Sequence, residues 1–271
     1  MDALSEFGPV VMLGCGKMGS ALLSRWIDGG LPPGKIWVLD PRPADWLTAC
    51  DGLHLNDGLP GSAALAVVAV KPQVLPEALP ILAPLAGGET LFLSFVAGVP
   101  HATYRDILGD DVPVIRTVPN TPASIGRGIT ALHGNGQVTE AQLALGEALL
   151  SAVGKVVRLT REDQLRLETS VAGCGPAYVF HLIEAMTEAV VGEGLPRDIA
   201  AMLAVETVAG AGALASISDR SCAQLREDVT SPNGVTQAAL KVLMDDETGF
   251  PILLRRAVQA ALRRDDELGQ G

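Results

Sequence analysis

The chain has 271 residues, of which 48% are apolar and 19% charged, and its formal net charge is -11 at pH 7. This length suits about two compact domains, and the composition excludes intrinsic disorder and collagen-like structure. A negative charge without any local cluster of lysine and arginine disfavours nucleic acid and anionic membranes as partners. We therefore expect an ordinary folded protein.

The N-terminal segment MDALSEFGP is acidic and lacks the basic start and apolar core of a secretory signal. The longest apolar run, residues 63–70, is too short to cross a bilayer and is typical of a buried strand. These features predict a soluble, cytoplasmic protein. The four cysteines and four histidines are widely scattered, which predicts reduced thiols and no metal site.

The first half of the chain alternates short β-rich runs with helical stretches, notably residues 18–29 and 139–153. Strands that are buried on both faces and joined by crossover helices form a doubly wound parallel sheet. We therefore predict that residues 1–160 are a Rossmann-type, dinucleotide-binding α/β domain. The predicted strands are residues 10–13, 35–39, 65–70, 90–95, 112–117, 129–133 and 155–159.

From residue 161 onward the β pattern stops, which predicts an all-helical domain over residues 161–271. Pro176 and Pro196 suit the first turns of helices. The expected helix over 176–192 is apolar on nearly every face, so it must be buried on all sides. A domain of this size can hardly enclose such a helix alone, and we expect a homo-oligomer, either a dimer or an assembly of dimers. The predicted helices cover residues 161–171, 176–192 and 196–215, with two shorter ones after the polar segment DVTSPNGVT.

The segment VVMLGCGKMGSALLSRW carries a GxGxxG pattern directly after an apolar strand and at the start of a helix. The first glycine permits a tight turn, the second lets a pyrophosphate approach the backbone, and the third allows close helix–strand packing. The anion would lie at the helix N-terminus. The candidate cofactor-binding residues here are Gly14, Cys15, Gly16, Lys17, Met18 and Gly19.

A carboxylate, Asp40, ends the second predicted strand, about 20 residues after the glycines, as this type of site requires. Asp40 is expected to accept hydrogen bonds from the adenosine ribose and to repel a 2'-phosphate, which argues for NAD. Arg42 could instead hold that phosphate, which would favour NADP, or could be a solvated loop charge. The preference between NADP and NAD stays open at this stage.

Three later segments, AVKPQ at 69–73, FVAGV at 95–99 and RTVPNTP at 116–122, lie at the ends of predicted strands. Ligands of doubly wound sheets bind beyond the carboxyl ends of the strands. These loops are therefore expected to border the nicotinamide half of the cofactor. The further candidate cofactor-binding residues are Asn56, Ala69, Val70, Lys71, Pro72, Val96, Ala97 and Asn120.

Two more motifs, GCGPAYVF at 173–180 and DVTSPNGVT at 228–236, complete a characteristic series. In order and spacing, the glycine pattern, AVKPQ, RTVPNTP and these two motifs resemble pyrroline-5-carboxylate reductase over essentially the whole chain. The resemblance implies an enzyme that transfers hydride from NADH or NADPH to the C=N carbon of 1-pyrroline-5-carboxylate and so produces L-proline.

By this resemblance, the bend at 230–236 holds the substrate against the nicotinamide. A turn with exposed N–H groups can bind a small carboxylate without a basic side chain. Gly234 permits close backbone approach, the Ser231 hydroxyl adds a donor, and the Thr236 hydroxyl is expected to hydrogen-bond the ring nitrogen. Asp219 stands where relatives carry an acidic residue, and either orients the amine or is a solvated loop carboxylate. The candidate catalytic residues are Thr236, Ser231, Gly234, Val235 and Asp219.

This sequence departs from the family pattern at three positions. Ala172 and Cys174 replace serines, which removes two hydroxyl donors, and Asn233 replaces a glycine. Asn233 is expected to keep the turn, because asparagine tolerates a left-handed backbone.

Two alternative functions stay open. One is a β-hydroxyacid dehydrogenase, for which Lys241 would have to be the proton donor. The other is a non-catalytic dinucleotide-binding sensor.

Overall fold

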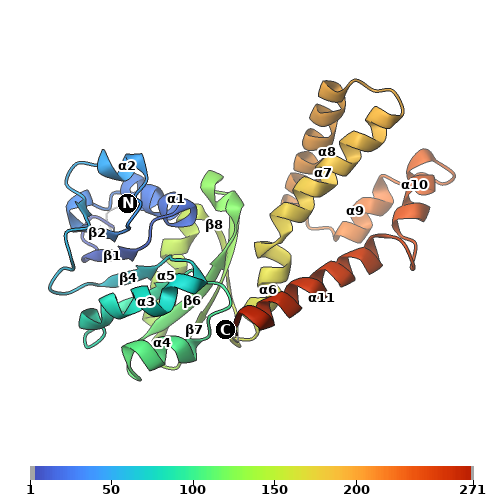
Figure 1. Cartoon of the computed structure of the whole chain (residues 1–271). Helices are drawn as coiled ribbons and strands as arrows, with labels where there is room; N and C mark the ends of the chain where they lie inside the picture. Colours follow the sequence, from blue (N-terminus) through green and yellow to red (C-terminus); the bar gives the residue numbers. More distant parts are fainter. Residues whose placement is uncertain (1–3, 270–271) are drawn as a thin grey trace. The chain divides into compact units, whose positions relative to one another are not determined.

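The computed structural model describes residues 4–269 (Figure 1). The chain divides into two compact units. One runs to Gly173 and resumes at Arg264, and the other is Cys174–Arg263. Residues 161–173, which the sequence pattern assigned to the helical domain, thus belong to the compact unit that contains the sheet.

The first unit is built on one eight-stranded sheet with the strand order β3-β2-β1-β4-β5-β6-β7-β8. This order, with crossovers on both sides of β1, confirms the predicted Rossmann-type α/β fold. The two-residue strand β3 was not predicted, because two residues are too few to show the alternating hydrophobic pattern of a strand. The strands are β1 (Val10–Leu13), β2 (Ile36–Leu39), β3 (His54–Leu55), β4 (Leu65–Val68), β5 (Leu91–Ser94), β6 (Val114–Pro119), β7 (Gly128–Gly134) and β8 (Gly154–Arg158).

One pair of strands departs from the predicted doubly wound parallel sheet, since β6 and β7 are antiparallel. Only a short 3-10 turn, η4 (Thr121–Ile125), and a few loop residues join these strands. A parallel pair needs a crossover of a dozen or more residues, so a connection this short can only reverse the chain. As a result, Arg116 on β6 lies directly opposite His133 on β7.

Helices cover both faces of the sheet (Figure 1). Alternate residues of a strand point to opposite faces, so Met12 packs with α1 and α5 on one side while Val11 packs with α3 and α4 on the other. Both faces are therefore buried. The helices of this unit are α1 (Lys17–Asp28), α2 (Asp45–Thr48), α3 (Leu75–Ala78), α4 (His101–Leu108), α5 (Glu140–Leu150) and α6 (Gln164–Glu168). The 3-10 turns are η1 (Pro33–Lys35), η2 (Pro72–Val74), η3 (Leu79–Leu85), η4 and η5 (Ser151–Val153).

The second unit is entirely helical in its regular structure, as predicted. Three details differ from the expectation. The helix expected over 161–171 is the short α6 followed by a π-helical turn (Thr169–Gly173), α9 precedes the polar bend, and the last helix is long. The helices of the second unit are α7 (Gly175–Gly192), α8 (Arg197–Ile217), α9 (Cys222–Asp228), α10 (Val235–Leu243) and α11 (Phe250–Gly269). The last residues of α11 belong to the first unit.

Helices α7 and α8 pack against each other but leave large apolar side chains uncovered within the chain. Phe180 and Met202 are each 60% exposed. Among the described residues, α8 is long and apolar enough to cross a membrane by length and composition, with 11% of its apolar window buried. A helix of this kind has an alternative partner in the apolar surface of a second subunit.

Candidate functional site

The first glycine of the GxGxxG segment is required by backbone geometry. Gly14 follows β1 with φ +79°, and a Cβ atom there would lie 2.9 Å from the carbonyl oxygen of Ala69. A Cβ on Gly19 would lie 3.2 Å from the Met12 sulfur, so the absence of a side chain here lets helix α1 pack closely on the sheet. The turn and the close packing that the pattern predicted are both confirmed.

The second glycine faces open space. Gly16 caps α1 without a side-chain hydrogen bond, and no heavy atom lies within 4 Å of a Cβ built there. The N–H groups of the first helical residues, Lys17, Met18 and Gly19, have no acceptor within the part of the chain that the structure describes. These free amides and the helix dipole favour an anion, so the residues present fit a pyrophosphate.

Asp40 is fixed at the end of β2 by several hydrogen bonds. Its carboxylate accepts the backbone N–H of Cys15 at 2.7 Å and that of Arg42 at 2.8 Å. Asn56, held at φ +58° after β3, accepts the Asp40 N–H at 3.0 Å and donates to the Asp40 carbonyl at 2.9 Å. The structure therefore joins Asp40, the glycine turn and Asn56, and leaves the Arg42 side chain exposed.

Cys15 contributes its backbone to this site, and its thiol is buried. Burial is the main cause that raises the pKa of the thiol to about 11, against the smaller opposing effect of the Ser20 hydroxyl. A thiol with so high a pKa carries almost no thiolate at neutral pH and is a poor nucleophile. Cys15 is therefore a structural residue of the turn.

The strand-end loops that the sequence singled out lie at one edge of the sheet, because β4, β5 and β6 are parallel. Ala69 donates its N–H to Leu13 at 2.8 Å, which places the loop of Val70, Lys71 and Pro72 beside the glycine turn. Lys71 is exposed and Pro72 opens the 3-10 turn η2.

The next two strand ends are more buried. Val96 is buried and Ala97 is half-buried, in the loop that follows β5. Asn120, after β6, donates its side-chain amide to Ala172 at 3.1 Å and accepts the Ile129 N–H at 3.0 Å. Both ends of the Asn120 amide thus bond to protein, which gives this residue a structural role beside the cofactor-binding role that the sequence predicted.

The polar bend of the second unit is a four-residue turn. Gly234 donates its N–H to the Ser231 carbonyl at 3.0 Å, with Pro232 second and Asn233 third in the turn. Asn233 has φ +56°, as the third position of a type II turn requires. The expectation that asparagine would adopt a left-handed conformation here is confirmed.

Gly234 then caps α10 without a side-chain hydrogen bond. Val235 and Thr236 are exposed in the first turn of α10, and no described residue accepts their N–H groups. Two bare amides and the Thr236 hydroxyl are therefore available beside the bend. Asp219 is exposed in the segment between α8 and α9. The bend and the glycine turn belong to different compact units, and each is described by itself.

An ionic cluster around the buried Arg116 in the first unit was missed by the sequence analysis. The Arg116 guanidinium on β6 donates to the Glu162 carboxylate at 2.5 Å, and the same oxygen accepts the His101 N–H at 2.6 Å. His101 Nε2 and His133 Nδ1 lie 3.1 Å apart. One feature of the sequence could have indicated this cluster: Arg116 lies in the strand predicted over residues 112–117, which was expected to be buried.

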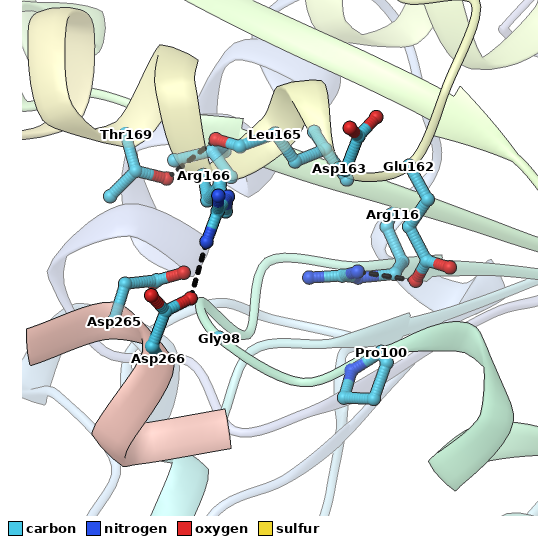
Figure 2. A pocket seen from close by; sticks show the side chains of 11 residues that line it. Gly98, Pro100, Arg116, Glu162, Asp163, Leu165, Arg166, Thr169, Asp265 and Asp266 are labelled. Atoms are coloured by element: carbon cyan, nitrogen blue, oxygen red, sulfur yellow. Dashed lines mark hydrogen bonds and ion pairs between the residues drawn. The ribbon is translucent and has the colours of Figure 1, made fainter. Parts of the chain in front are cut away.

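Arg116 and Glu162 line a pocket of about 480 Å³ (Figure 2). Burial chiefly lowers the pKa of His101 to about 4, so this imidazole is neutral at physiological pH. Burial by itself raises the pKa of Glu162, but the hydrogen bonds from His101 and Arg116 outweigh it and the net pKa is lowered. Glu162 is therefore a stable anion. The pocket is completed by Gly98, Pro100, Val118, Asp163, Leu165, Arg166, Thr169, Asp265 and Asp266.

Relatives of this chain at 32–39% identity carry the name pyrroline-5-carboxylate reductase. Residues 162–268 match the family model for pyrroline-5-carboxylate reductase dimerisation. A pyrroline-5-carboxylate reductase of Pseudomonas aeruginosa is 37% identical over 266 residues, which cover 96% of this chain and 97% of the relative. The chain belongs to the pyrroline-5-carboxylate reductase family. The predicted resemblance is thereby confirmed.

Solved structures of pyrroline-5-carboxylate reductases agree. The enzyme from Coxiella burnetii is 33% identical, with a TM-score of 0.87 over 97% of this chain and 99% of that one. The Plasmodium falciparum pyrroline carboxylate reductase, whose structure has NADP bound, is 24% identical, with a TM-score of 0.83 over 98% of this chain and all of that one, and shows the shared fold.

Membership of the pyrroline-5-carboxylate reductase family decides against the two alternatives that the residues left open. The β-hydroxyacid dehydrogenase interpretation needed Lys241 as a proton donor. Lys241 lies on α10 with an exposed side chain, as a solvated lysine does. The sensor interpretation gave no reason for the bend, which lies within the matched region of the reductase family.

Proposed function

We propose that this chain catalyses the NADH- or NADPH-dependent reduction of 1-pyrroline-5-carboxylate to L-proline, by hydride transfer to the carbon of the C=N bond. The similarity to a curated reductase across 96% of the chain carries this proposal. The glycine turn, with its open cradle at Gly16, supports it independently, because a reductase of this class must hold a dinucleotide.

The dinucleotide, when bound, supplies the hydride. The free amides of Lys17, Met18 and Gly19 would bind its pyrophosphate, and Asp40 would accept hydrogen bonds from its adenosine ribose. The loops at 69–72 and 95–97 would border the nicotinamide half. NADP and NAD are both candidate cofactors of the proposed reaction.

The bend at 230–236 would bind the substrate. Its bare amides at Val235 and Thr236 suit the substrate carboxylate, and Gly234 lets the ring approach the backbone. The Thr236 hydroxyl would hydrogen-bond the ring nitrogen, Ser231 would add a second hydroxyl, and Asp219 would orient the amine. These roles are proposed for the assembled enzyme.

The proposed chemistry needs alignment more than acid catalysis. A protonated imine is a better hydride acceptor than a neutral one, and hydride transfer itself neutralises the charge, so no strong acid is required. Residues 230–236 contain no histidine or lysine, in keeping with this chemistry. The protein's main contribution would be to hold the reacting atoms about 3 to 3.5 Å apart and to exclude water.

The proposed assembly is a homo-oligomer, either a dimer or a set of dimers, in the cytoplasm. The matched family model describes dimerisation, and the exposed apolar side chains of α7 and α8 provide a surface for it. The net charge of -11 supports the absence of nucleic acid and anionic membranes among the partners.

A single assay tests the proposed reaction. Purified protein with NADPH or NADH should oxidise the nicotinamide when 1-pyrroline-5-carboxylate is added, with L-proline as the product, and the absorbance of the reduced ring reports the rate. If the nicotinamide is oxidised by the carbonyl forms of β-hydroxyacids but not by the cyclic imine, the β-hydroxyacid dehydrogenase alternative would be favoured instead. Dinucleotide binding without oxidation of either kind would favour the sensor.

A further inference from the structure

The loop between β5 and α4, residues 95–100 with the sequence FVAGVP, carries two of the proposed nicotinamide contacts, Val96 and Ala97. Its side chains are all apolar or absent, so none of them can hydrogen-bond the loop in place. Gly98 adopts φ +74°, which gives the loop a sharp change of direction. Other parts of the first unit must therefore hold it by its backbone.

The start of the loop is held by Ser94 and Tyr104. The Val96 N–H donates to the Ser94 hydroxyl at 3.2 Å, and this hydroxyl lies 2.5 Å from that of Tyr104 on α4. Ser94 and Tyr104 are both buried, at 1% and 0% exposure, so water does not compete for these bonds. The first residues of the loop are thus tied to the helix that follows it.

The end of the loop is held by Glu162. The N-cap residue of α4 is Pro100, which offers no side-chain acceptor to the helix. Glu162, in the segment between β8 and α6, supplies the missing acceptor, because its carboxylate takes the His101 N–H at 2.6 Å. A negative charge at the first N–H of a helix is also favoured by the helix dipole.

Glu162 is itself fixed by Arg116, whose side chain is 9% exposed on β6 (Figure 2). The guanidinium and the His101 N–H bond to the same carboxylate oxygen. Arg116 pairs in register with Ser94 on β5. The two supports of the loop therefore rise from neighbouring positions of adjacent strands.

We propose that Glu162 and Tyr104 are positioning residues of the reductase, which hold loop 95–100 in place against the nicotinamide ring. This inference rests on the proposed function, which sets that loop beside the ring. Hydride transfer depends steeply on the alignment of donor and acceptor. An ion pair that is only partly buried, as this one is, contributes little net stability by comparison with apolar packing, so positioning is a better reason for this pair than stability.

The experiment compares Glu162→Gln and Tyr104→Phe with the wild type. Glutamine keeps an oxygen that can accept the His101 N–H but removes the charge that Arg116 fixes, and phenylalanine removes only the hydroxyl that meets Ser94. Glu147→Gln is the matched control. Glu147 also pairs with an arginine, Arg158, at 2.8 Å and has a similar exposure, 39% against 34% for Glu162, but it supports no loop at the site.

The readout separates the two halves of the dinucleotide. Both loop variants should bind NADH or NADPH about fivefold more weakly, while ADP-ribose or its 2'-phosphate, which lack nicotinamide, should bind as they do to the wild type. The kcat should fall about tenfold with the KM for 1-pyrroline-5-carboxylate little changed. Hydrogen exchange at residues 95–101 should speed up in the variants without cofactor.

Three results would overturn the proposal: the same changes in Glu147→Gln, equal weakening of the whole dinucleotide and its fragment, or unchanged binding and exchange in both loop variants. A failure of the proposed reductase function can be distinguished from a failure of this positioning proposal. A wild type that does not reduce the cyclic imine contradicts that function, while the binding and exchange comparisons still decide whether Glu162 and Tyr104 position the loop.

Discussion

Asp40 places a negative charge where the adenosine ribose of a bound dinucleotide is proposed to lie. Because the Cys15 and Arg42 N–H groups hold both of its oxygens, the carboxylate cannot turn away from an incoming 2'-phosphate. Each oxygen retains lone pairs that a ribose hydroxyl can use. We therefore propose that cofactor preference depends on this residue and on the exposed Arg42.

Asp40→Ser should move the preference toward NADPH. We expect the ratio of kcat/KM for NADPH to that for NADH to rise about tenfold, which corresponds to about 1.4 kcal/mol. Steady-state kinetics with both cofactors measure this ratio. Arg42→Ser is the control, and it should lower the same ratio if the guanidinium binds the 2'-phosphate. An unchanged ratio in Asp40→Ser means that Asp40 does not contact the ribose.

Thr236→Ala tests the proposed hydrogen bond to the substrate nitrogen. Loss of the hydroxyl should lower kcat/KM for 1-pyrroline-5-carboxylate about tenfold, as expected for one hydrogen bond, while the affinity for NADPH stays the same. Thr236→Ser retains a hydroxyl and should recover most of the rate. Equal rates for wild type and Thr236→Ala would remove Thr236 from the mechanism.

Glu168, at the end of α6, has both carboxylate oxygens buried without a hydrogen-bond partner among the described residues. Burial raises its pKa from the ordinary 4.5 to about 8. The folded state therefore binds more protons than the unfolded state between these values. By linkage, this group lowers stability progressively as the pH rises from about 4.5 to 8.

Glu168→Gln should remove this pH dependence, because the amide stays neutral. The variant should have a higher unfolding temperature than the wild type at pH 8, and the difference should shrink toward pH 5. Thermal unfolding across this range measures it. The same slope in both proteins would mean that a cation pairs with Glu168 in solution.

At the scale of elements, the polar bend is set by local chemistry. Pro232 presets the second position of the turn, Asn233 accepts the left-handed third position, and Gly234 opens α10. The Asn233 N–H also donates to the Gln237 side chain at 2.8 Å, which ties the turn to the helix. The bend is thus rigid without help from distant residues.

Asn233→Val should strain this turn. A β-branched residue at φ +56° should cost about 1–2 kcal/mol of unfolding free energy and should weaken substrate binding. Denaturant unfolding and the KM for the imine measure the two effects. Asn233→Gly, which suits the same backbone, should match the wild type in both. A tolerated valine would show that the bend adopts another conformation in solution.

At the scale of the whole molecule, the second unit leaves many large apolar side chains exposed within the chain. Phe180 on α7 and Met202 on α8 are two of these side chains, and each is 60% exposed. Burial of such side chains is worth roughly 1.5–3 kcal/mol each. A second subunit on this surface accounts for helices that are apolar on nearly all faces.

The double variant Phe180→Glu with Met202→Glu should dissociate the homo-oligomer, because two charges would be buried without partners. Light scattering coupled to size-exclusion chromatography measures the mass. His181→Glu, on the same helix at an exposed polar position, should leave the assembly intact. A wild type that is monomeric at all concentrations would contradict the proposed assembly.

Features that depend on local backbone geometry were predictable from the sequence alone. The glycine turn at 14–19, the left-handed Asn233 and the helix starts near Pro176 and Pro196 each follow from what one residue type permits in its own position. The order of motifs likewise identified the family. These properties need no knowledge of which distant segments meet.

Only the tertiary structure decided the properties that join distant segments. The carboxylate of Glu162 contacts Arg116 and His101, which are far from it in the chain. A pattern of hydrophobicity along the sequence does not predict such a contact. The reversal of β7, the place of residues 161–173 with the sheet and the exposure of α7 also depend on packing between segments. Local rules state what each segment permits, whereas the contacts between segments select one of the permitted arrangements.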